Sequence, residues 1–110
     1  MQVMFKTWEH LLVGLNKTHD IQKNLMSVLF IIGLQESGSG FKKYTQAEKT
    51  EIIKLAQLKL LSREKYYTQI ATDKNNLPIW AENPIKQLPD GKILEKLLRS
   101  LALDYFNENL

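Results

Sequence analysis

The sequence predicts a mainly α-helical single domain over residues 1–110, with four helices and a short two-stranded β-hairpin between the third and fourth helices (α+β by strict count). The strongest observation is an uncharged run of ten residues, 25–34. A bilayer span needs about 20 apolar residues, so this run indicates a buried central helix of a globular domain. Apolar residues at helical spacing elsewhere predict the other helices, and one alternating segment predicts the hairpin.

Length and composition support a globular protein. A chain of 110 residues with 44% hydrophobic and 25% charged content can bury a core without disulfides or a structural metal. It has no cysteine, which excludes disulfides and thiolate chemistry. The first residues do not follow the pattern of a secretory signal. We therefore expect a cytoplasmic protein with no membrane partner.

The first two helices are predicted by their spacing and caps. Apolar residues at helical spacing predict a first helix over residues 4–15. Thr18 or Asp20 can cap the second helix, because their side-chain oxygens accept hydrogen bonds from free amides in the first turn. The second helix runs to about residue 36, and the glycine-rich residues 37–40 end it.

The third helix is predicted over residues 45–63, starting at the capping-box pattern in which Glu48 follows Thr45 by three residues. Its apolar residues form two stripes: Ile53, Ala56 and Leu60 on one side, and Leu55, Leu58 and Leu61 on the other. A helix with two apolar stripes needs cover on both sides. It therefore lies between neighbours or buries one stripe against a second subunit.

The hairpin and the last helix follow. Residues 66–72 alternate and are rich in aromatic and β-branched types, residues 73–76 have turn chemistry, and residues 78–82 return as a second strand. Pro78 lacks an amide hydrogen, so it must start that strand or lie on an edge. Asp90 then precedes a last helix with one apolar stripe.

No catalytic, metal or cofactor signature is present. In residues 38–43, Phe41 separates glycine from lysine, so this segment fails as a phosphate-binding loop. His10 and His19 are nine residues apart, which is not a metal-ligand spacing. No nucleophile-elbow pattern occurs. We therefore expect a non-enzymatic protein with no catalytic residues, no metal ligands and no cofactor.

The positive charge is concentrated in residues 41–65, where seven bases face three acids. The order helix, helix, helix, hairpin is also that of a winged-helix domain, which makes nucleic-acid binding the alternative hypothesis. The bases that would carry it are Lys42, Lys43, Lys49, Lys54, Lys59 and Arg63. We disfavour this alternative, because these bases are dispersed around a helix and interleaved with leucines.

The preferred hypothesis is a small protein-interaction or accessory domain whose partner is another protein or a second copy of the chain. It rests on the apolar stripes that exceed what one core needs, because an exposed apolar surface marks a contact site. The residues expected to make this contact are Leu55, Leu58, Leu61 and Trp80.

Overall fold

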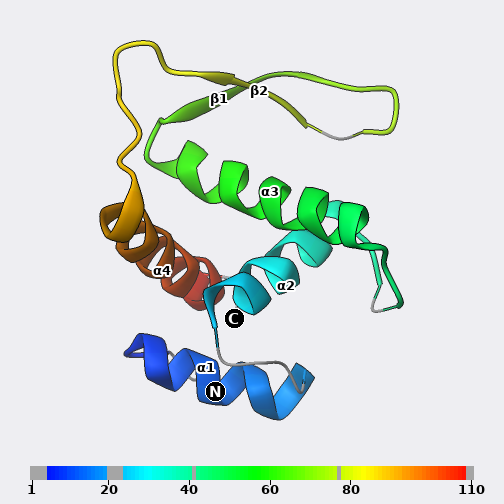
Figure 1. Cartoon of the computed structure of the whole chain (residues 1–110), viewed down its shortest axis with the longest axis vertical. Coiled ribbons are helices and arrows are strands. Elements are labelled where there is room, and N and C mark those ends of the chain that lie inside the picture. The colour runs from blue at the N-terminus through cyan, green and yellow to red at the C-terminus, as the bar shows by residue number, and fades with distance from the viewer. Residues whose placement is uncertain (1–4, 20–23, 41, 77, 109–110) are drawn as a thin grey trace.

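The computed structural model describes residues 5–19, 24–40, 42–76 and 78–108, although the side chains of residues 18 and 19 are not described. The elements in chain order are α1 (Trp8–His19), α2 (Leu25–Ser37), α3 (Gln46–Arg63), β1 (Tyr67–Thr72), β2 (Pro78–Glu82) and α4 (Gly91–Glu108). The predicted fold class is confirmed: four helices, with an antiparallel two-stranded sheet between the third and fourth (Figure 1).

The junction between the first two helices differs from the prediction. Thr18 lies inside α1, which continues to His19, so it does not cap the next helix. Asp20 lies outside the described residues. The residue that caps α2 is Asn24, whose side-chain oxygen accepts a hydrogen bond from the Ser27 amide at 2.9 Å. Asn is as good a cap as Asp or Ser, so several candidates competed in this stretch.

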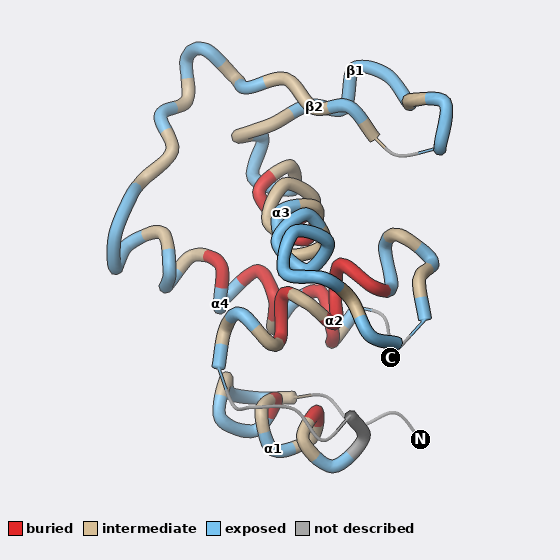
Figure 2. Tube along the Cα trace, turned by 45° about the vertical axis from the view of Figure 1, so that its right-hand side comes forward, coloured by how far each residue is buried: buried red, intermediate tan, exposed pale blue. Residues whose placement is uncertain are grey.

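Helix α2 is the central buried element, as the uncharged run predicts. Val28, Leu29 and Ile32 are fully buried in the shared core (Figure 2). The helix ends at Gly38, whose φ of 70° lies in the left-handed region. The Ser39 amide donates to the Leu34 carbonyl at 3.0 Å, which satisfies an acceptor left free by the last turn.

Helix α3 lies directly against α2, and the two backbones approach each other closely at Gly33. A Cβ atom on Gly33 would lie 2.6 Å from Ile52 Cγ2 and closer still to the Ile52 carbonyl oxygen. Only glycine allows this approach of two helix backbones. The start of α3 is the predicted capping box: the Glu48 amide donates to Thr45 Oγ1 at 3.1 Å, and the Thr45 amide donates to Glu48 Oε1 at 2.8 Å.

Tyr105 on α4 joins three helices. Its hydroxyl donates to Gln35 Oε1 of α2 at 3.1 Å, and the Arg63 guanidinium of α3 lies 5.4 Å from its ring centroid. Arg63 also pairs with Glu108 of α4 at 2.6 Å. Burial raises the pKa of the Tyr105 phenol to about 12, with a further contribution from Glu36. These contacts fix α4 against the α2–α3 pair.

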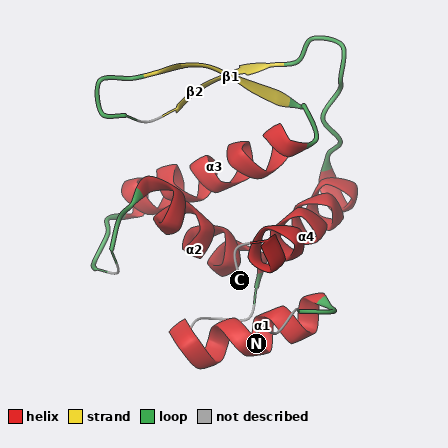
Figure 3. Ribbon diagram, turned by 180° about the vertical axis from the view of Figure 1, so that it is seen from behind, coloured by secondary structure: helices red, strands yellow, loops and turns green. Residues whose placement is uncertain are grey.

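The hairpin lies on the far side of α3 from α2 (Figures 1 and 3). Its two strands pair in antiparallel register from Tyr67 opposite Glu82 to Thr72 opposite Pro78, with a bulge between Gln69 and Ala71. Pro78 starts β2, as predicted, so its missing amide donor costs no central ladder bond. Most β1 residues are exposed.

The base of the hairpin is tied to the end of α3. Asn83 donates to the Tyr66 carbonyl from its amide at 3.0 Å and to the Lys65 carbonyl from its side chain at 2.9 Å. Lys86 Nζ lies 4.4 Å from the Tyr66 ring centroid. The hairpin is therefore anchored at one end, while its strands extend over α3.

Replacing Gly33 with alanine tests the close approach of α2 and α3. The added methyl group meets backbone atoms that cannot rotate away, so we expect Gly33→Ala to lower the free energy of unfolding by about 1–3 kcal/mol in urea denaturation. At a spacious helical site the same change stabilises by about 1 kcal/mol. Gly14→Ala is the matched control: its nearest neighbour is the Phe5 ring, which can move, so its loss should be smaller. Equal stability of Gly33→Ala and the wild type would contradict this packing.

The raised pKa of Tyr105 predicts a loss of stability at alkaline pH. Below pH 10 the phenol is neutral in both states, and wild type should exceed Tyr105→Phe by about 1 kcal/mol through its hydrogen bond to Gln35. Between pH 10 and about 12 the unfolded chain ionises at this position and the folded chain does not, which removes about 2 kcal/mol from wild type alone. The order of the two denaturation midpoints should therefore reverse near pH 11, roughly midway in that interval. A constant difference across the range would contradict the raised pKa of Tyr105.

Candidate functional site

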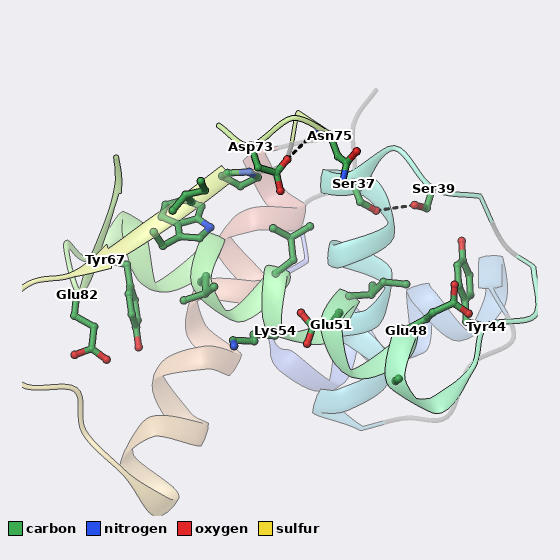
Figure 4. A pocket seen from close by; sticks show the side chains of 17 residues that line it. Ser37, Ser39, Tyr44, Glu48, Glu51, Lys54, Tyr67, Asp73, Asn75 and Glu82 are labelled. Atoms are coloured by element: carbon green, nitrogen blue, oxygen red, sulfur yellow. Dashed lines mark hydrogen bonds between the residues drawn. The ribbon is translucent and has the colours of Figure 1, made fainter. Parts of the chain in front are cut away.

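A groove of about 1030 Å³ separates α3 from the hairpin (Figure 4). We call it the α3–hairpin groove. Its walls are α3 on one side, the β2 strand and the hairpin turn on the other, and the end of α2 with the following loop at one end. The residues that line it include Glu48, Glu51, Ile52, Lys54, Leu55, Leu58, Tyr67, Asp73, Pro78, Ile79, Trp80 and Glu82.

Both long walls of the groove carry apolar side chains. Ile52, Leu55 and Leu58 on α3 are only half-buried. On β2, Ile79 is 42% exposed and Trp80 is half-buried. The two walls therefore present apolar surface to the same open space without filling it.

Three of the four residues predicted to make an interaction surface come together here. Leu55, Leu58 and Trp80 line the groove, from α3 and from β2. Leu61 does not: it is 4% exposed and belongs to the core. Successive residues of a helix are rotated by about 100° around its axis, so residues spaced by three do not stay on one face. Leu61 follows Leu55 by six residues and therefore points roughly 120° away from it.

The indole of Trp80 is unusual among the polar groups of the groove. Its Nε1 atom is buried and, within the described residues, has no hydrogen-bond partner. A buried donor without an acceptor costs about 1–3 kcal/mol. Trp80 is therefore held in place by packing rather than by a polar contact.

The groove also collects acidic side chains, which the sequence analysis missed. Glu48 and Glu51 come from α3, Asp73 from the hairpin turn and Glu82 from the end of β2, while Lys54 is the one base among the described lining residues. The hydrogen bonds to Thr45 hold the pKa of Glu48 below its ordinary value, so this carboxylate is charged. Asp73 accepts a hydrogen bond from the Asn75 amide at 2.8 Å.

The bases proposed for nucleic-acid binding have different surroundings. Lys42, Lys43 and Lys49 are exposed before and at the start of α3, and Lys42 Nζ lies 5.5 Å from the Tyr44 ring centroid. Lys54 lines the acidic groove. Lys59 lies 3.9 Å from Glu36, and Arg63 pairs with Glu108.

The described histidine makes local contacts only. Nδ1 of His10 accepts a hydrogen bond from the Lys6 amide at 3.3 Å, and its ring meets the Phe5 ring edge-on at 5.6 Å. The side chain of His19 is not described. In the part of the chain that the structure describes, no group of three or more His, Cys, Asp or Glu side chains could hold a metal ion.

Comparison with known proteins does not assign this chain to a family. No family model, no curated protein and no solved structure matches this chain. Among the described residues, the helices are too short or too polar for any of them to cross a membrane. The functional proposal therefore rests on the geometry and charge of the α3–hairpin groove.

Proposed function

We propose that this chain is a small cytoplasmic, non-enzymatic protein-interaction domain that holds a segment of its partner in the α3–hairpin groove. The observation that carries the proposal is the pair of apolar walls, Leu55 and Leu58 on α3 and Trp80 on β2, on either side of an open groove. Its cytoplasmic part rests on the sequence alone.

Filling the groove would stabilise both the hairpin and the complex. An isolated two-stranded hairpin is marginally stable in water and needs cover on a face. Here the hairpin is tied at its base, and Ile79, which lines the groove, is 42% exposed. A partner that buries apolar area gains about 2.5 kcal/mol for each ~100 Å² removed from water, before the cost of association.

The nucleic-acid alternative draws less support from these features. Two of its six bases, Lys59 and Arg63, already have carboxylate partners, and a third, Lys54, lies in a groove with four acids. Phosphates favour an uninterrupted basic face. We therefore keep a protein partner, or a second copy of the chain, as the proposed ligand.

Site-specific photocrosslinking tests the proposal. A benzophenone amino acid placed at Ile79, which lines the groove, should give a discrete protein adduct in the cells that make this chain. The same group at Ile70, which is more exposed but lies outside the groove lining, should not give that adduct. Mass spectrometry then separates an adduct with another protein from an adduct with a second copy.

The control variant is Leu58→Lys, which places a charge in the apolar wall. It should abolish the Ile79 adduct while the circular dichroism melting curve remains cooperative, because Leu58 is only half-buried. Adducts of equal yield from Ile70 and Ile79, or an adduct insensitive to Leu58→Lys, would exclude the groove as the contact surface. Crosslinks to DNA or RNA at Ile79 would favour the alternative.

A further inference from the structure

We infer that the occupant of the α3–hairpin groove is a basic amphipathic polypeptide segment, with apolar side chains on one face and lysine or arginine beside them. This inference rests on the proposed function and adds the chemistry of the partner. It is carried by the combination of apolar walls and carboxylates in one groove.

The carboxylates are spread along the groove rather than gathered at one point (Figure 4). Glu82 lies near Tyr67 at one end, Glu48 lies near Tyr44 at the other, and Glu51 lies between them. Asp73 adds a charge from the hairpin turn. A ligand that matches this distribution must carry several positive charges along its length, as an extended or helical segment does.

Negative charge is concentrated in the groove lining, although Lys42 acts on Glu48 there. The whole chain has a formal net charge of +3, yet the described residues of the groove lining include four carboxylates and one lysine. Within the described residues, neither Glu51 nor Glu82 takes part in an ion pair, whereas Glu36 and Glu108 elsewhere each have a basic partner. The bases among the described residues therefore leave Glu51 and Glu82 without an ionic partner.

Lysine and arginine suit this groove better than any other charged group. Their methylene stems cover apolar surface while the charged ends reach outward to carboxylates. The walls at Leu55, Leu58 and Trp80 receive the apolar side chains and stems, and Glu51 and Glu82 receive the charges. Nucleic acids and acidic peptides bring further negative charge and are repelled.

The test uses the full chain and three synthetic amphipathic peptides of about 18 residues, which is long enough to form a helix when bound. The peptides share one set of leucine positions and differ only in their polar positions, which are all Lys, all Gln or all Glu. In the variant Trp8→Phe, Trp80 is the remaining tryptophan and reports on the groove. In Trp80→Phe, the remaining Trp8 reports on α1, on the other side of the helical body from the hairpin (Figure 1).

We expect the lysine peptide to shift the fluorescence of Trp80 but not that of Trp8. Its Kd should be at least about tenfold lower than that of the glutamate peptide at ~50 mM salt, and the difference should shrink at ~300 mM salt through screening. Glu51→Gln with Glu82→Gln should weaken binding about threefold to tenfold. Glu9→Gln with Asp104→Asn removes the same charge from exposed sites outside the groove lining and should have little effect.

Other results of these measurements would overturn the inference about the partner. Equal binding of the Gln and Lys peptides at Trp80 would overturn the basic partner and leave the groove as a docking site. Equal weakening by both double variants would overturn the inference, because it indicates unspecific charge attraction. No Trp80 response to any peptide would also overturn it, and the crosslink from Ile79 would then decide the proposed function independently. Dimers in sedimentation that Glu51→Gln with Glu82→Gln dissociates would identify a second copy as the occupant instead.

Discussion

The close contact between α2 and α3 at Gly33 determines how the rest of the molecule is arranged. Because a Cβ at Gly33 would collide with Ile52, the two helices can approach closely only with glycine at this position. With α3 in this position, Ala56 and Leu60 point into the core, where both are fully buried. The opposite side of α3, with Leu55 and Leu58, is thereby left to the hairpin and to the groove.

Polar contacts between side chains also hold the helices against one another. Tyr105 and Arg63 join α4 to α2 and α3, and Asn107 exchanges two hydrogen bonds with the Phe5 backbone at 2.8 and 2.9 Å, which ties α4 to the N-terminal segment. At the base of the hairpin, Asn83 and Lys86 make such ties to the end of α3. Polar contacts thus join the helices to one another, and the groove lies between α3 and the hairpin, beyond these contacts.

The sequence predicted the fold well because the strongest signals were local. The uncharged run, the Thr45–Glu48 capping box and the turn before Pro78 each act within a few residues. The junction before α2 was missed because Asn24 competed with equally good caps. The apolar half of the groove was predicted in part, through Leu55, Leu58 and Trp80. Its acidic half was not, because those carboxylates come from α3, the hairpin turn and β2, and meet only through tertiary packing.

The acids of the groove also oppose its closure. Carboxylates stand on both walls, with Glu51 on α3 and Glu82 and Asp73 on the hairpin. Two like charges 4 Å apart repel by about 1 kcal/mol in bulk water and by about 4 kcal/mol at an effective dielectric constant near 20. Closure of the groove would move the carboxylates of the two walls into a drier environment, where like charges repel more strongly. The basic amphipathic segment that we propose would meet both conditions, since it would neutralise the carboxylates and cover the leucines and Trp80. In this proposal, the charge and the apolar surface of the groove act together in recognition.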